Sequence, residues 1–321
     1  MRLSEAIELY VSRRQHEGST YISGETVLRM MCNRIGDVPL DHLPAADIIR
    51  FLHRPEISNV TQLGQYSMVN RFLQFWAHRG DMPALTIPPP PRFERTYVPH
   101  IYSRFQIRLM LTQCRITQAK SRSIDAPTFR LFLLTLYATG ARVGEVRNLR
   151  ISDLDLRHGK MLFRSGSPER TRCIPINADL NHQLRRFLTR NRSRESLVPC
   201  VFSTVSGRPL VRSYLNQCFR RLQRAGAVVR SDDSSHEPRM QDLRPTFAVH
   251  RLTSWIKQGV DMNRMLPALS AYMGYSGLVA AEKFLALTPE RFRRQLRILS
   301  PENGRKHWRN DSELMTFLAK L

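Results

Sequence analysis

The sequence has no apolar run long enough to cross a membrane. A membrane-spanning helix needs about 20 consecutive, mostly apolar residues. The 321-residue sequence contains no such stretch and no segment that looks like a signal peptide. We therefore expect a cytoplasmic protein that is not inserted in a membrane.

Cysteine is scarce, and it is not arranged to do chemistry. The five cysteines are scattered, odd in number and without a Cys-x-x-Cys pair, which disfavours both a disulfide framework and a zinc site. We expect reduced thiols, mostly in or near cores, and no metal or other cofactor. These cysteines are Cys32, Cys114, Cys173, Cys200 and Cys218.

Acidic residues are few. The chain has 27 Asp and Glu against 50 Lys and Arg, a formal net charge of +23. Such an excess predicts a polyanionic partner, most simply nucleic acid, with an anionic membrane surface as the rival. A hydrophobic content of 42% over 321 residues excludes wholesale disorder and suffices for two ordinary domains.

The chain is organised around residues 138–146, Ala-Thr-Gly-Ala-Arg-Val-Gly-Glu-Val. An apolar run, 131–138, predicts a buried helix that Gly140 ends, because glycine adopts the left-handed conformation cheaply. Arg142 follows between two helix ends, where its planar fork suits a phosphate. The alternative is a structural arginine paired with Glu145.

Helical spacing of apolar residues predicts a compact helical domain over residues 1–82, with its strongest helix ending at Gly80. Four prolines, Pro88 to Pro91, then predict an extended linker over 83–102. Ser103 with Gln106 forms a capping-box pattern for the next helix.

Period-two patterns after Arg142 predict three short strands, at 151–156, 161–164 and 172–176, and two basic helices follow at 177–192 and 213–224. The expected fold class is therefore mainly α with a small antiparallel sheet (α+β). Further on, Asp242 is a candidate helix cap. Arg244 lies near that helix's N-terminus, where backbone donors also favour a phosphate.

Three stretches resemble the boxes of the tyrosine recombinases, the phage integrase family. They are Ala-Thr-Gly-Ala-Arg-Val-Gly-Glu-Val-Arg-Asn-Leu at 138–149, Gln-Asp-Leu-Arg-Pro-Thr-Phe-Ala at 241–248, and Leu-Ser-Ala-Tyr-Met-Gly-Tyr at 269–275. The resemblance covers about Ser103 to Arg291. It implies a DNA-clamping core-binding domain at 1–82, a catalytic domain at 103–296 and a C-terminal tail or helix at 297–321.

The resemblance also implies a chemistry. In this family two arginines stabilise the charge on a phosphate without metal, and here Arg142 and Arg244 match them. The family's proton-donating lysine aligns with Ser167, and nearby Arg172 cannot replace it because arginine stays protonated. Gln241 stands where the family has histidine.

The remaining departures concern the end of the site. Tyr275 occupies a histidine or tryptophan position, and Phe284 occupies that of the nucleophilic tyrosine. No tyrosine lies beyond Tyr275, so no shift of register restores the nucleophile. Either the active site is naturally degenerate, which Ser167 and Gln241 favour, or Phe284 was introduced. Tyr275 or Tyr272 as substitute nucleophile is the less favoured alternative.

The implied function is DNA integration and site-specific recombination of a mobile element, since residues 266–270 and 288–290 are similar to transposon- and plasmid-borne integrases. The implied partners are double-stranded DNA and other recombinases, the same or different, in an oligomer associated with the nucleoid. Residues 314–321 could form an amphipathic helix that docks on a neighbour or folds back. The alternatives are a catalytically inactive DNA-binding member that assists an active recombinase, and an unrelated basic regulator or RNA-binding protein.

Overall fold

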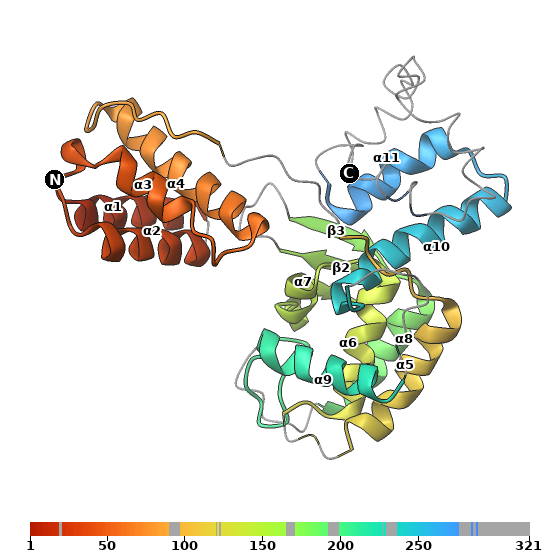
Figure 1. Cartoon of the computed structure of the whole chain (residues 1–321). Coiled ribbons are helices and arrows are strands. Elements are labelled where there is room, and N and C mark those ends of the chain that lie inside the picture. Colours follow the sequence, from red (N-terminus) through yellow and green to blue (C-terminus); the bar gives the residue numbers. More distant parts are fainter. Residues whose placement is uncertain are drawn as a thin grey trace. The chain divides into compact units, whose positions relative to one another are not determined.

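The computed structural model describes residues 1–18, 21–89, 97–119, 121, 123–164, 171–191, 199–226, 228, 236–275, 284 and 287. Ser167 and the predicted C-terminal helix lie outside the described residues. The chain divides between Thr96 and Tyr97 into two compact units (Figure 1). None of the helices in the described ranges is both long and apolar enough to cross a bilayer.

The first unit is helical, as predicted. It contains α1 (Leu3–His16), α2 (Ile22–Ile35), α3 (Ala45–Leu52) and α4 (Asn59–Arg79), with a short 3-10 helix at Leu40–His42. The longest helix, α4, begins at Ser58, whose hydroxyl accepts a hydrogen bond from the Thr61 amide, and ends at the left-handed Gly80. Its apolar face supplies Phe72 and Trp76 to the core, where Tyr10 meets Phe72 edge-on.

The residues between the units belong partly to each core. Ile87 is buried in the first core and Leu85 packs against it, whereas Tyr102 is fully buried in the second. Both ends of the stretch 83–102, predicted to be a linker, are therefore anchored by apolar side chains.

The second unit holds seven α-helices in its described part. They are α5 (Arg104–Thr117), α6 (Ala126–Thr139), α7 (Val143–Arg147), α8 (Ala178–Asn191), α9 (Arg212–Arg224), α10 (Leu243–Lys257) and α11 (Met262–Met273). The predicted cap of α5 is confirmed, because Ser103 and Gln106 form a capping box. At the start of α6, the Asp125 side chain accepts a hydrogen bond from the Thr128 amide.

A three-stranded antiparallel sheet joins α7 to α8, in the order β1 (Leu154–Asp155), β2 (Lys160–Phe163) and β3 (Arg172–Pro175). The first predicted strand was too long, because residues 151–153 form a 3-10 helix. The buried carboxylate of Asp153 explains the turn: it accepts hydrogen bonds from the Arg150 amide (3.1 Å) and from Arg164 Nε (2.7 Å).

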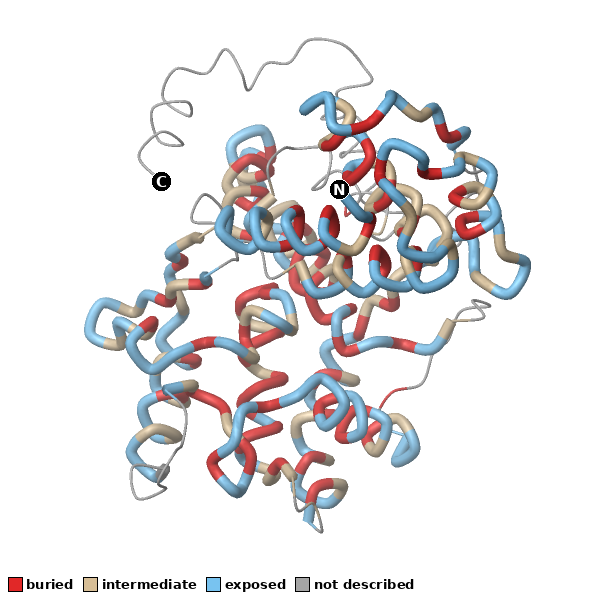
Figure 2. Tube along the Cα trace, turned by 90° about the vertical axis from the view of Figure 1, so that its left-hand side faces the viewer, coloured by how far each residue is buried: buried red, intermediate tan, exposed pale blue. Residues whose placement is uncertain are grey.

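Helix α6 is the centre of this unit. It contacts α5, α7, α8 and α10, and buried positions cover more than half of its circumference. In Figure 2, buried stretches alternate with exposed ones along the helices. A helix that is apolar nearly all round is stable only inside a core. Its C-terminal end is therefore a fixed point, and the residues that follow it are held accurately in place.

Candidate active site

Gly140 fixes the geometry at the end of α6. Its φ of +61° disfavours residues with a side chain, and a Cβ there would lie 2.5 Å from the ring of Phe247. Glycine is therefore favoured at position 140 for two reasons: the backbone conformation, and the space that the Phe247 side chain of α10 occupies.

Arg142 is the N-terminal boundary residue of α7. Its amide donates to Glu145 Oε2 (2.7 Å), and its Nη1 donates to Glu145 Oε1 (2.8 Å). The pairing of Arg142 with Glu145, which the sequence analysis gave as an alternative, is thus present. The Arg142 side chain nevertheless remains 47% exposed, so the pairing orients the guanidinium without hiding it from a ligand.

Glu145 is held from the other side by Arg172 on β3. Nη1 and Nη2 of Arg172 donate to the two carboxylate oxygens at 2.7 and 2.9 Å, and its Nε donates to the Tyr272 carbonyl at 3.0 Å. The side chains of Arg172 and Glu145 are only 10% and 9% exposed. This bidentate pair ties the sheet to the ends of α7 and α11.

The pKa of Glu145 reflects these opposing influences. Burial alone would raise the pKa, but the hydrogen bonds and charges of Arg172 and Arg142 outweigh it and lower the pKa to about 2. The carboxylate is therefore ionised at neutral pH and compensates the positive charge that gathers here.

Arg244 lies in the first turn of α10 and is buried. Its Nη1 donates to the Gly140 carbonyl (2.7 Å), its Nη2 to the Met273 carbonyl (2.6 Å), and its Nε to the Tyr275 hydroxyl (3.1 Å). Burial lowers the Arg244 pKa; Tyr275 opposes that shift and Arg142 reinforces it. Two of the five guanidinium N–H groups are left over from these three bonds.

Tyr275 and Phe284 complete this corner. The Arg244 guanidinium lies 4.6 Å from the centre of the Tyr275 ring, and that ring lies 5.9 Å from the ring of Phe284. Phe284 is buried and belongs to the small apolar cluster of α10 and α11. The Phe284 ring, which has no hydroxyl, thus lies beside Tyr275, the residue that contacts Arg244.

Tyr272 points elsewhere. Its hydroxyl donates to the Pro175 carbonyl (3.2 Å), its ring stacks on Phe247, and burial raises its pKa to about 12. A hydroxyl engaged in this way and hard to ionise is a poor nucleophile.

Gln241 adjoins Arg142 across the start of α7. Its Oε1 accepts from the Val143 amide (3.1 Å), an otherwise unsatisfied donor of the first helical turn. This bond leaves the amide NH2 as a donor toward the open side of the site.

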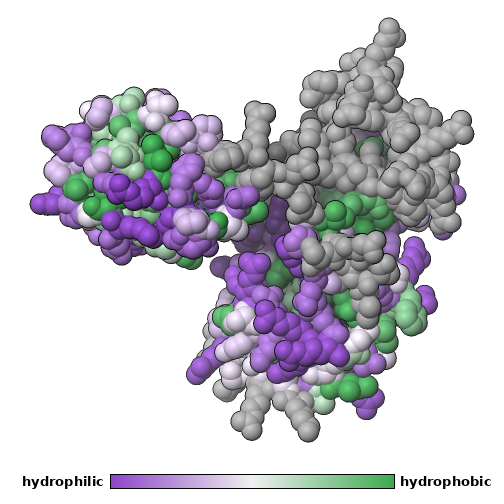
Figure 3. Space-filling model, viewed as in Figure 1, coloured by the Kyte–Doolittle hydropathy of each residue, from purple (hydrophilic) through white to green (hydrophobic). Residues whose placement is uncertain are grey.

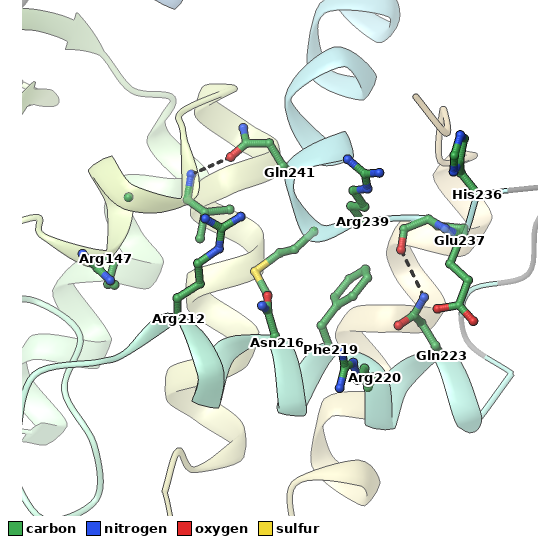
Figure 4. Close-up of a pocket in the computed structure, with 14 residues that line it drawn as sticks. Arg147, Arg212, Asn216, Phe219, Arg220, Gln223, His236, Glu237, Arg239 and Gln241 are labelled. Carbon is green, nitrogen blue, oxygen red and sulfur yellow. Dashed lines mark hydrogen bonds between the residues drawn. The ribbon is translucent and has the colours of Figure 1, made fainter. Parts of the chain in front are cut away.

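That open side is a groove of about 570 Å³ between α7, α9 and residues 236–241 (Figure 4). Its cationic lining comes from Arg147, Arg212, Arg220 and Arg239, and Glu237 is the one carboxylate among the lining residues that the structure describes. Hydrophilic side chains also gather over α9 in Figure 3. A basic groove that begins at Gln241 can hold a chain of phosphates that passes Arg142.

The arginines of α9, the basic helix predicted at 213–224, point in different directions. Arg220 lines the groove, but Arg221 turns to α5, where its Nη1 donates to Gln118 Oε1 (3.2 Å). Neighbouring residues on a helix point in different directions. The sequence alone does not show which of these two arginines faces the groove.

Asp242 is not the side-chain cap of α10 that the sequence suggested. Its buried carboxylate accepts from the Arg239 amide (2.8 Å) and the Tyr97 hydroxyl (2.5 Å). Nearby, Tyr102 donates from its amide to Thr246 Oγ1 (3.1 Å) and from its hydroxyl to the Arg239 carbonyl (2.7 Å). The segment before α5 thus holds the start of α10 in place.

The structure brings together Arg142, Arg244, Gln241, Tyr275 and Phe284. Sequence reasoning missed the buried ion pair of Arg172 with Glu145, whose members are 27 residues apart. Only the apolar, alternating surroundings of Arg172 in β3 hinted that this arginine is buried.

The comparisons with known proteins agree with this geometry. Residues 104–274 match the model of the phage integrase family. The chain is 30% identical to the proposed integrase/recombinase y4rB of Sinorhizobium fredii over 63% of this chain and 65% of that protein. It is 25% identical to y4rE of the same organism over 90% of this chain and 95% of that protein.

Solved structures share the fold. The Tn1549 transposon integrase in complex with circular intermediate DNA matches with a TM-score of 0.62 and 15% identity, over 94% of this chain and all of that one. A lambda integrase dimer bound to a core site gives a TM-score of 0.58 and 17% identity, over 88% and 95%. With its ordered boxes, its fold and a family match across more than half its length, this chain belongs to the phage integrase family.

Proposed function

We propose that this protein acts in DNA integration and site-specific recombination, and that it binds one phosphate of duplex DNA with Arg142 and Arg244. The observation that carries the proposal is the convergence of these two guanidinium groups beside a basic groove. Nη2 of Arg142 donates to the Gly274 carbonyl and Nη2 of Arg244 to the neighbouring Met273 carbonyl, so both arginines meet at the end of α11.

Each side chain has a role in this proposal. Arg142 and the spare N–H groups of Arg244 contact the non-bridging phosphate oxygens, where charge develops during transesterification. Gln241 adds an amide donor. The Tyr275 hydroxyl, which accepts from Arg244, keeps its own proton to donate to the same phosphate.

The groove lined by Arg147, Arg212 and Arg220 would carry the flanking backbone. Contacts to phosphates fix position and register without reading sequence. The related integrases solved with DNA support duplex DNA as the ligand, and the protein would work beside other recombinases at the nucleoid.

A second candidate role is that of a catalytically inactive member that occupies sites for an active partner. Phe284 favours it: the buried ring beside Tyr275 fills the place aligned with the nucleophilic tyrosine. Without a phenolic oxygen there, the 3′-phosphotyrosyl bond of the family cannot form at that position.

Duplex binding at increasing salt tests the proposal. We expect log affinity to fall steeply with log salt, because bound arginines release counterions. Arg142→Gln should weaken binding and reduce the slope by about 1, whereas Arg157→Gln, which removes an exposed charge from the turn between β1 and β2, should not. Affinity that is independent of salt would refute a DNA ligand.

A further inference from the structure

A second cationic groove lies at the opposite end of α6 from the active site. It has a volume of about 600 Å³ and is bounded by the end of α5, the start of α6 and the second half of α8. Its arginines are Arg115, Arg130, Arg186 and Arg190. All four are exposed, and the ion pairs found among the described residues of this unit involve other side chains.

This groove is separate from the phosphate site. The 14 residues of α6 lie between Asp125, at the groove, and Gly140, at the active site. With a rise of 1.5 Å per residue, the helix separates them by about 20 Å. No residue in the described part of the chain lines both grooves, so an anion held at Arg130 is not the one held at Arg142.

The charge around the groove is poorly compensated. Among the described residues that line it, Asp125 is the one carboxylate against four arginines, and its Oδ1 accepts a hydrogen bond from the Thr128 amide (3.1 Å). Arg186 and Arg190 are one helical turn apart on α8, where like charges repel each other. A bound anion would relieve this repulsion.

Apolar side chains also contribute to the lining of the groove, among them Leu131 and Phe187. Leu131 is buried, and the ring of Phe187 packs against Phe202 with centroids 5.9 Å apart. The charged groups that this surface offers a partner are four exposed guanidinium groups. Rows of exposed arginines suit the repeated phosphates of a DNA strand, each of which accepts a forked pair of hydrogen bonds.

We propose that this groove binds the phosphodiester backbone of a second DNA segment while the groove lined by Arg147, Arg212 and Arg220 holds the first. The inference goes beyond the proposed function, because it adds a binding surface that the phosphate site does not require. A chain with two such surfaces can hold two DNA segments together.

A capture assay with the full chain tests the proposal. The protein is loaded on a sparsely immobilised duplex, free protein is washed away, and a second, fluorescent duplex is titrated. The double variant Arg186→Gln/Arg190→Gln is compared with Arg108→Gln/Arg157→Gln, which removes two exposed charges outside both grooves. The matched charge loss cancels general electrostatic effects.

We expect both variants to load on the first duplex like the unmodified chain. The groove variant should capture the second duplex roughly tenfold more weakly, with a salt slope lower by about 2, and the control should match the unmodified chain. Failure of the first loading would count against the phosphate site alone.

Equal capture by the two variants, or no capture by the unmodified chain, would overturn the second site. Polyglutamate serves as the additional probe. If it binds the unmodified chain and not the groove variant, while duplex capture is unaffected, the groove takes an acidic protein segment and the DNA proposal is wrong.

Discussion

Nη1 of Arg244 donates a 2.7 Å hydrogen bond to the carbonyl of Gly140, so the second arginine of the site is fastened to the helix end that positions the first. Arg142, by contrast, is half exposed and hydrogen-bonds mainly to its own helix turn. The two arginines match one motif pattern, but they have different structural roles.

This difference predicts different costs of substitution. Arg244→Gln should lower the free energy of unfolding by about 3 kcal/mol, because it leaves buried carbonyls of Gly140 and Met273 without their charged donors. Arg142→Gln should change it by no more than about 0.5 kcal/mol, as is usual for surface positions. Urea unfolding of both variants checks this, and equal losses would contradict the assignment of separate roles.

Glu145 should make stability depend on pH in the acid range. Its pKa falls from an ordinary 4.5 to about 2 on folding, so its contribution is complete above pH 4.5 and disappears as the pH falls from 4.5 toward 2. By linkage, about 2 kcal/mol of it is lost by pH 3.

The measurement is the difference in unfolding free energy between the unmodified chain and Glu145→Gln. It should shrink by that amount between pH 6 and pH 3. Parallel stability curves for the two proteins would show that the carboxylate is not held by Arg172 in solution.

Gly140 should tolerate alanine less well than Gly259. Both have positive φ, +61° and +66°, but only at Gly140 would the new Cβ meet an atom, the Phe247 ring at 2.5 Å. We expect Gly259→Ala to cost about 1 kcal/mol from backbone strain, and Gly140→Ala to cost at least about 1 kcal/mol more from displaced packing. Thermal unfolding of the two variants gives the comparison, and equal costs would mean that Phe247 moves aside freely.

Phe284 should decide whether covalent chemistry occurs. The unmodified chain is expected to form no denaturation-resistant adduct on a suicide DNA substrate. Phe284→Tyr should give at most slow adduct formation, because Gln241 cannot shuttle a proton and each missing acid–base group costs about 10²–10⁴-fold. Adding Gln241→His and Ser167→Lys should raise the rate further.

Tyr275→Phe is the control for this experiment. An adduct of the unmodified chain that disappears in Tyr275→Phe would move the nucleophile to the hydroxyl beside Arg244. The same result with Tyr272→Phe would be incompatible with the hydrogen bond from Tyr272 to Pro175.

Local signals made much of this fold predictable. Ser103, Asp125, Gly80 and Gly274 mark helix ends through backbone geometry or capping, and these depend on residues within one turn. Arg142 and Arg244 were predictable because their motifs surround them in the sequence.

Contacts between distant segments were not predictable. The carboxylate of Asp242 accepts a hydrogen bond from Tyr97, which lies 145 residues earlier, and does not cap its own helix. The second arginine groove draws on three helices, and no local pattern shows that Arg115 and Arg190 share a surface. The long-range geometry that places Tyr275 on Arg244 depends equally on how α10 and α11 pack.

The anchoring of Tyr97 and Tyr102 sets the physical boundary of the second unit. A fragment excised at the capping residue of α5 would include every family box, yet it would remove the hydroxyl that satisfies Asp242 and both bonds from Tyr102 to Thr246 and Arg239. The helix that carries Arg244 would then begin on an under-satisfied buried carboxylate. Limited proteolysis or recombinant expression should therefore yield a stable autonomous fragment only when the cut falls before Tyr97.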